Sequence, residues 1–134
     1  MFPNLAQPLS PVEARALDPL TLAYVGDAVQ SLYVRATLAL TQGGAAGKLH
    51  RLAIRQVSAS AQAEELSRVR ALFTPEEEDV YRTARNHKTK SSAKNASTGE
   101  YHKATGLEAV WGYLYLTGQQ DRLVYLLAQT KESL

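Results

Sequence analysis

The stretch 20–40, LTLAYVGDAVQSLYVRATLAL, is a long apolar run that decides the fold of this chain. At about 3.6 residues per turn, its apolar side chains surround a helix on nearly all sides, which predicts a central, buried helix. Asp27 is the only acidic residue between Asp18 and Glu64. A buried ionised carboxylate is costly unless it is paired or bound to a metal, so Asp27 is a candidate functional residue.

A second stretch of the same kind carries Glu108. Residues 103–118, KATGLEAVWGYLYLTG, are again mostly apolar, and Glu108 is their only acid. Gly112 follows one turn later and permits the close approach of another backbone. Two lone carboxylates on apolar helices predict a shared metal site, with the helices crossing near Gly26 and Gly112. The alternative is that each acid pairs with an arginine or a hydroxyl group from elsewhere in the fold.

The residue types narrow the choice of metal and of chemistry. Oxygen ligands alone favour Mg²⁺ or Mn²⁺. The chain contains no cysteine, which excludes a disulfide framework and a thiolate metal site. His50, His87 and His102 are not spaced as a zinc-binding set. The motifs of P-loop nucleotide-binding proteins, dinucleotide-binding folds, zinc metalloproteases and serine hydrolases are absent as well.

Length and composition are typical of one ordinary globular domain. A chain of 134 residues, 45% hydrophobic and 21% charged, is large enough for a core and predicts a single domain over 1–134. It contains no run of about 18 apolar residues, so no membrane span and no membrane partner are expected. The N-terminal segment lacks the regions of a signal peptide, which favours a cytoplasmic protein.

The chain reads as helices separated by short breaks, without convincing strand alternation. Asp18-Pro19 and Thr74-Pro75 each place a capping side chain before a proline, which is typical of a helix start. We expect an all-α fold with helices over 11–16, from Pro19 to before Gly43, in two pieces within 46–73 separated at 58–60, from Thr74 to before 86, and over 103–117 and 119–131.

Residues 86–100, NHKTKSSAKNASTGE, have no apolar periodicity and predict a mobile loop. The surrounding span 82–103 holds six of the fifteen lysines and arginines and a single acid, Glu100. Lysine, arginine, asparagine and serine mixed in this way suit a phosphate backbone, which they bind without reading sequence. A solvated loop without a ligand is the alternative, and we favour phosphate binding.

Taken in order, these motifs resemble the ribonuclease III family. YVGDAV at 24–29 and GLEAVWGYLYL at 106–116 are similar to the two acidic helices of that family. KLHRLAIRQVSASAQA at 48–63 and RTARNHK at 82–88 extend the similarity over nearly the whole chain. The resemblance is greatest to the Mini-ribonuclease III group, the short form that lacks a double-stranded-RNA-binding domain.

The resemblance implies an endonuclease that uses a divalent metal to cleave double-stranded RNA. Asp27 and Glu108 match the two catalytic metal ligands of the family, and Mg²⁺ or Mn²⁺ is the implied cofactor. Further acids of the full-length enzymes are replaced here by Ala23, Thr105 and Lys48. With two carboxylates, a metal ion must keep several water ligands or use phosphate oxygens of the RNA.

The family fold is an all-α homodimer with one active site in each subunit. The substrate that the resemblance implies is a precursor of bacterial large-subunit (23S) ribosomal RNA, with a ribosomal protein or a pre-ribosomal particle as a further partner. A dimer face would account for the many aromatic residues, although core packing would account for them equally well: Tyr24, Tyr33, Trp111, Tyr113 and Tyr115.

Without a separate RNA-binding domain, the chain must contact A-form RNA from its own surface, through phosphates and 2′-hydroxyl groups. The alternative to an enzyme is a helical module of the same fold that binds RNA or the ribosome and cleaves weakly or not at all. The missing carboxylates favour this alternative, and the retention of both Asp27 and Glu108 favours the enzyme. The expected RNA-binding residues are Lys48, His50, Arg51, Arg82, Arg85, Asn86, Lys88, Lys90 and Lys94.

Overall fold

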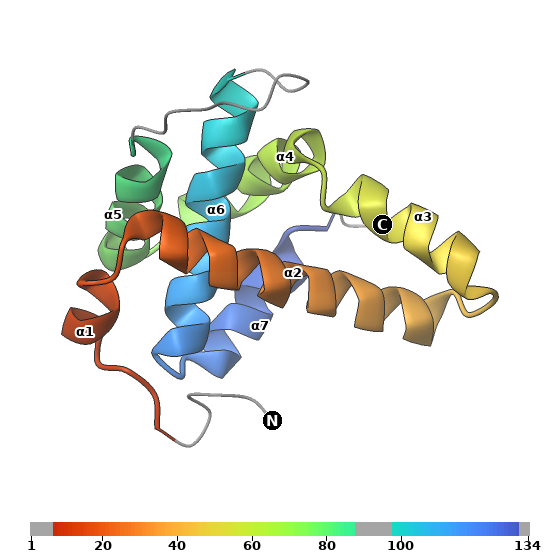
Figure 1. Ribbon diagram of the computed structural model, residues 1–134, viewed down its shortest axis with the longest axis horizontal. Coiled ribbons are helices and arrows are strands. Elements are labelled where there is room, and N and C mark those ends of the chain that lie inside the picture. Colours follow the sequence, from red (N-terminus) through yellow and green to blue (C-terminus); the bar gives the residue numbers. More distant parts are fainter. Residues whose placement is uncertain (1–6, 88–97, 132–134) are drawn as a thin grey trace.

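The computed structural model describes residues 7–87 and 98–131, which form helices without any β-strand (Figure 1). The all-α expectation is confirmed. Within these ranges no helix is long and apolar enough to cross a membrane. The helices are α1 (Pro11–Arg15), α2 (Pro19–Thr41), α3 (Ala46–Gln56), α4 (Ala59–Val69), the 3₁₀ turn η1 (Arg70–Leu72), α5 (Pro75–Arg85), α6 (Thr98–Leu116) and α7 (Gln120–Gln129).

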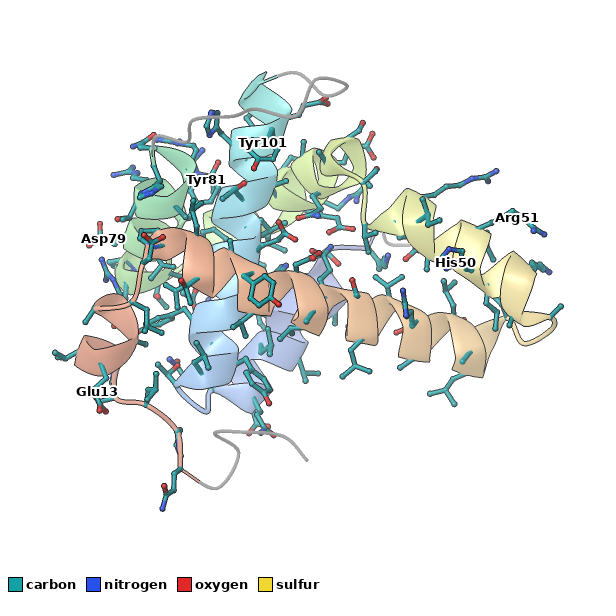
Figure 2. The ribbon with its side chains drawn as sticks, viewed as in Figure 1. Glu13, His50, Arg51, Asp79, Tyr81 and Tyr101 are labelled. Carbon is teal, nitrogen blue, oxygen red and sulfur yellow. The ribbon has the colours of Figure 1, made fainter. Side chains whose placement is uncertain are left out.

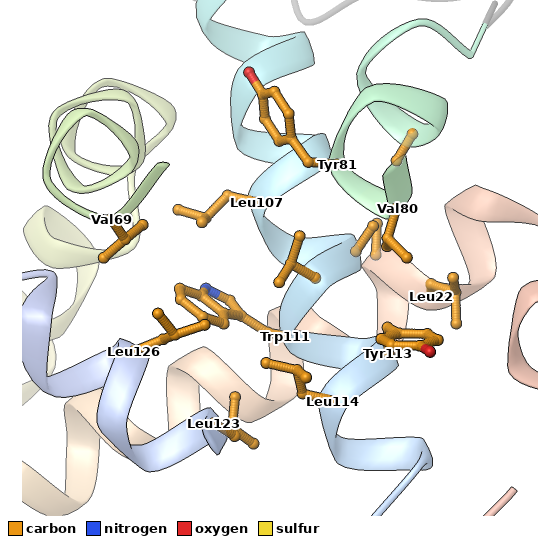
Figure 3. Packing of buried hydrophobic residues seen from close by; sticks show 14 of the residues in the cluster. Leu22, Val69, Val80, Tyr81, Leu107, Trp111, Tyr113, Leu114, Leu123 and Leu126 are labelled. Carbon is orange, nitrogen blue, oxygen red and sulfur yellow. The ribbon is translucent and has the colours of Figure 1, made fainter. Parts of the chain in front are cut away.

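Helix α6 is the centre of the fold, and α1, α2, α4, α5 and α7 all pack against it. Its middle turns are buried on every side because they carry large apolar residues at consecutive positions. The main core therefore surrounds α6, and Glu108 lies on the most constrained helix of the chain. Figure 3 shows this core, whose fully buried side chains include Val69, Tyr81, Leu107, Trp111, Tyr113, Leu114 and Leu126.

Helices α2 and α6 cross with their backbones in direct contact. A Cβ atom on Gly26 would lie 1.6 Å from the carbonyl oxygen of Glu108, and one on Gly112 would lie 1.9 Å from the carbonyl oxygen of Leu22. Neither position has room for a side chain, so glycine is required on both helices. The predicted crossing near Gly26 and Gly112 is confirmed, and it brings Asp27, the neighbour of Gly26, close to α6.

Local capping signals fix where most helices begin. Thr74 forms a capping box with Glu77 at the start of α5. Asp18 accepts a hydrogen bond from the backbone N–H of Leu20 at 2.7 Å, just ahead of Pro19 in the first turn of α2. These starts are as predicted. The break between α3 and α4 lies at Val57 and Ser58, slightly before the predicted 58–60.

The predicted start of the sixth α-helix, at 103, is wrong, because α6 already begins at Thr98. Its extra turn overlaps the loop that was predicted over 86–100. Glu100 lies in this first turn, where the helix dipole favours an acid. Tyr101 is half-buried and lines a hollow between α2, α4 and α6. Tertiary contact therefore overrides a composition that is typical of a loop.

The prediction that α2 is buried on nearly all sides is wrong for the single chain. Tyr24 is 81% exposed, Leu32 55% and Leu40 88%. Asp27 is exposed as well. The second half of α2 extends past α6 and has α3 beside it (Figure 1). An apolar pattern shows that a face needs a partner, but it does not show which chain supplies that partner.

The second half of α2 and α3 form an arm with a small core of its own, which we call the α2–α3 arm. Val34, Leu38 and Ala53 are buried in this core, and Leu49 and Leu52 pack against them. The cluster shares no residue with the main core around α6. The arm therefore carries α3 away from the centre of the fold.

We expect the substitution Gly26→Ala to lower the free energy of unfolding by roughly 3 kcal/mol, the upper end of the usual cost of overpacking. The added methyl group must push α2 away from the Glu108 carbonyl, because no side-chain movement can make room for it. Urea unfolding followed by circular dichroism measures the loss.

Gly47→Ala on α3 is the matched control. A Cβ atom there would meet its nearest neighbour, the Arg51 guanidinium, at an ordinary 3.7 Å. Because alanine favours a helix over glycine, this variant should be as stable as the parent or more stable by up to about 1 kcal/mol. Equal stability of the two variants would contradict a backbone contact between α2 and α6.

Candidate active site

The crossing of α2 and α6 brings the side chains of Asp27 and Glu108 together. The two carboxyl groups are within hydrogen-bonding distance of each other. They face a hollow of about 420 Å³ that is bounded by α2, α4 and α6. The predicted proximity of the two lone acids is thus confirmed. The hollow is lined by Leu20, Ala23, Tyr24, Asp27, Val57, Ala59, Gln62, Tyr101, Ala104, Thr105 and Glu108.

The two acids have different surroundings. Asp27 is exposed, whereas Glu108 is half-buried at the inner wall of the hollow. Burial, together with the hydrogen bond and the negative charge of Asp27, raises the pKa of Glu108 to about 9. At neutral pH the Glu108 carboxyl therefore favours its protonated form. Asp27 and Glu108 are the residues that would hold a cation here, and its charge would favour the ionised form of Glu108.

This donor set fits a hard divalent cation. Two carboxyl groups offer oxygen ligands only, which suits Mg²⁺ or Mn²⁺. Over residues 7–87 and 98–131, no group of three or more His, Cys, Asp or Glu side chains is arranged to hold a metal ion. Ala23 and Thr105 line the same hollow, so these two positions bring no charge to the site. The Thr105 hydroxyl donates to the carbonyl oxygen of Tyr101 at 3.0 Å.

Sequence reasoning did not single out Gln62, which lies on α4 at the same wall of the hollow. Its side chain is buried, and its amide lies beside the Glu108 carboxyl and acts to lower the pKa of that acid. The residue belongs to the SASAQA run that contributed to the family resemblance. An uncharged glutamine gives no periodic or charge signal, so its place at the site could only be seen in the fold.

The predicted RNA-binding residues lie in two groups that the fold does not bring together. Lys48, His50 and Arg51 are exposed on α3, at the outer end of the α2–α3 arm. Arg82, Arg85 and Asn86 lie at the end of α5. Figure 2 shows Tyr81 of α5 near one end of α2, and His50 and Arg51 near the other end. The crossing of α2 and α6 lies between these two ends (Figure 1).

Arginine side chains of the α5 group already contact other residues of the same chain. Arg82 forms a 2.7 Å ion pair with Glu78. The Arg85 guanidinium lies over the Tyr81 ring at 5.3 Å and donates to the side chain of Asn86 at 3.1 Å. Lys88, Lys90 and Lys94, together with most of the predicted mobile loop, lie outside the described residues.

A second buried carboxyl group lies outside the hollow, between α2 and α4. Glu65 accepts a hydrogen bond from the Gln30 amide at 2.7 Å. Burial raises the pKa of Glu65 to about 7, against the opposing influence of Lys131, Gln30 and Arg68. The pair fastens α2 to α4 beneath the site, and it was not recognisable in the sequence.

Because the pKa of Glu65 is higher in the folded chain than its ordinary value of 4.5, folding favours the protonated acid. The contribution of Glu65 to the free energy of unfolding should therefore fall as the pH rises from about 4.5 to about 7, and it should stay constant at higher pH. We expect Glu65→Gln to remove this loss. The difference in melting temperature between the variant and the parent should therefore shift in favour of the variant as the pH rises from 5 to 7. Thermal unfolding across this pH range measures the gain.

Glu64→Gln is the control, since Glu64 is the exposed neighbour on the same helix. Its melting temperature should follow that of the parent at every pH. If Glu65→Gln also followed the parent at every pH, the buried carboxyl would not be protonated on folding.

Comparison with known protein families matches residues 20–119 to the Ribonuclease III domain. This range contains all of α2 except Pro19, both site carboxyl groups and the whole described part of α6. The match thus covers most of the chain and centres on the crossing of α2 and α6.

Bacterial proteins named Mini-ribonuclease 3 are similar over nearly the same length. That of Symbiobacterium thermophilum is 44% identical over 124 residues, which cover 92% of this chain and 91% of that protein. That of Thermoanaerobacter sp. is 41% identical over 112 residues, covering 84% and 79%. That of Staphylococcus aureus is 42% identical over 115 residues, covering 84% and 86%.

Among solved structures, the crystal structure of a protein from Fusobacterium nucleatum is similar in fold. It aligns with a TM-score of 0.77 over 90% of this chain and 94% of that one, at 25% sequence identity. The similarity therefore extends from the sequence to the arrangement of the helices.

Proposed function

Since the chain belongs to the ribonuclease III family, among its Mini-ribonuclease 3 members, it is an endoribonuclease for double-stranded RNA, and we propose that Asp27 and Glu108 form its catalytic metal site. Enzymes of this family generally depend on a divalent metal. The observation that carries the proposal is the contact between the two carboxyl groups at an open hollow. Glu108 is half-buried, and a carboxylate withdrawn from water is unfavourable unless a cation compensates for it.

The ion that we propose is Mg²⁺, with Mn²⁺ as a substitute. When bound, it supplies Lewis-acid stabilisation of the negative charge that develops at the scissile phosphate. Asp27 of α2 and Glu108 of α6 would hold the ion, and the close crossing of these helices at Gly26 fixes the separation of the two residues. The hollow is open to solvent and admits a phosphate group of the RNA backbone. The two groups of basic residues, on α3 and at the end of α5, contact the duplex on either side of the site.

Asp27→Asn should abolish cleavage of a long RNA duplex in Mg²⁺, which means a loss of rate of roughly 100-fold or more. Removing a residue that only hydrogen-bonds to a metal ligand already costs up to that factor. The amide keeps the shape of the side chain but removes the charge that attracts the cation. Binding to the duplex and the melting temperature should be nearly unchanged. Gel analysis of products with Mg²⁺, with Mn²⁺ and with a chelator measures the effect.

Glu64→Gln, which removes an acid from the exposed surface of α4, is the control and should cleave at the parental rate. Near-parental cleavage by Asp27→Asn would overturn the site.

We further propose that the physiological substrate is a precursor of bacterial large-subunit ribosomal RNA, processed in the cytoplasm with a ribosomal protein or pre-ribosomal particle as partner. The same assay with a stem from such a precursor and an unrelated duplex of equal length tests this substrate.

Members of the family typically form dimers, and we propose that this chain dimerises through the exposed apolar face of α2. Tyr24, Leu32 and Leu40 give this face its apolar character. A second hollow, lined by Val25, Val29, Leu32 and other residues, continues the face onto Tyr115 of α6. Burying such a surface against an identical one removes apolar area from water.

We expect Leu32→Glu to dissociate the dimer, because it places a charge in the centre of this face. Val124→Glu on α7 is a matched control, since Val124 is 58% exposed and Leu32 is 55% exposed. Light scattering should report a mass near the 14.7 kDa of one chain for Leu32→Glu and about twice that for the parent and the control. A parent that stays at the mass of one chain at all accessible concentrations would exclude the dimer.

A further inference from the structure

Gln62 is held more firmly than a surface-facing glutamine would be. Its side chain is 3% exposed. One amide hydrogen is donated to the carbonyl oxygen of Val57, at 3.0 Å, where α3 ends and α4 begins. The amide also lies beside the Glu108 carboxyl in the same hollow, where it lowers the pKa of that acid. An amide nitrogen has two hydrogens, so the bond to Val57 fixes the group and leaves the second hydrogen for Glu108.

This orientation leaves the other end of the amide unsatisfied. The Oε1 atom of Gln62 is buried without a hydrogen-bond partner. A buried polar atom without a partner is unfavourable, and an apolar side chain of similar length would avoid it. Packing alone therefore does not account for a glutamine at this position, whereas the bond of its nitrogen to Val57 and its place beside Glu108 do.

We propose that Gln62 is a positioning residue of the metal site, which holds the Glu108 carboxylate in the orientation that receives the cation. This inference rests on the proposed function of Asp27 and Glu108. Glutamate has several rotatable bonds, and a carboxylate at a metal site is usually held by a further hydrogen bond from its surroundings. Gln62 supplies that bond from α4, so a third helix takes part in a site whose carboxylates come from α2 and α6.

The reduced number of acids increases the importance of this bond. Ala23 and Thr105 line the hollow where carboxylates would be needed for a richer set of ligands. With the ligand set limited to Asp27 and Glu108, the cation depends strongly on the orientation of each one. Gln62 acts through Glu108 and does not itself need to touch the metal or the RNA.

The test is Gln62→Met, which keeps the length of the side chain and removes both donors. Mn²⁺ binding is measured without RNA, by the electron paramagnetic resonance signal of the free ion. We expect the affinity of the variant for Mn²⁺ to fall roughly 10- to 100-fold, the usual effect of removing the hydrogen-bond partner of a metal ligand. Cleavage should recover towards the parental rate at saturating Mn²⁺, and duplex binding without metal should not change.

Gln30→Met is the matched control. Gln30 is also 3% exposed and also has a buried Oε1 atom without a partner, but it donates to Glu65 and does not line the hollow. Its Mn²⁺ affinity should equal that of the parent, even if its melting temperature changes. Should Gln62→Met fail to fold, Gln62→Asn decides, because it keeps an amide that is too short to bridge Val57 and Glu108.

The outcomes separate the two proposals. Parental Mn²⁺ affinity in the folded Gln62 variant would overturn the positioning role while leaving the metal site intact. An equal loss of affinity in Gln62→Met and Gln30→Met would also overturn it, because the effect would then come from the fold in general. Parental Mn²⁺ affinity and cleavage in Asp27→Asn would instead overturn the metal site itself.

Discussion

The contact between the backbones of α2 and α6 at Gly26 and Gly112 is the constraint on which the rest of the structure depends. It replaces the usual layer of side chains between two helices with direct backbone packing. The side chains that flank the glycines then meet at close range, which is how carboxyl groups on different helices come into contact. A wider crossing would separate these groups, and the other helices around α6 could not restore their contact. The geometry of the site is thus a property of the backbone more than of the acids.

Much of this arrangement could be predicted from the sequence, because its signals are local or chemical. Thr74 with Pro75 and Glu77 determines the start of α5, since capping requires only neighbouring residues. The isolation of Asp27 and Glu108 on apolar stretches indicated that they meet, since solitary buried charges need compensation. Gly112, one turn from Glu108, indicated where the helices approach.

The remainder depends on contacts between distant residues, which a pattern along the chain does not specify. The apolar face of α2 was predicted to be buried, but periodicity cannot distinguish a core from an interface between chains. The first turn of α6 has the composition of a loop, yet Tyr101 takes a place at the hollow. Gln62 meets Glu108, and Gln30 meets Glu65, across different helices, so nothing near them in the sequence marks these contacts.

The separate small core of the α2–α3 arm has a consequence for how this enzyme can diversify. Val34, Leu38 and Ala53 stabilise the arm without sharing contacts with the main core. Substitutions on the outer surface of α3 therefore have little means of disturbing the packing around α6. Affinity for different RNA duplexes can change on the arm while the carboxylates keep their places. Natural variation and laboratory selection for new substrates should both be tolerated best on the outer surface of α3, away from Val57, which packs on the core of the arm and also lines the hollow.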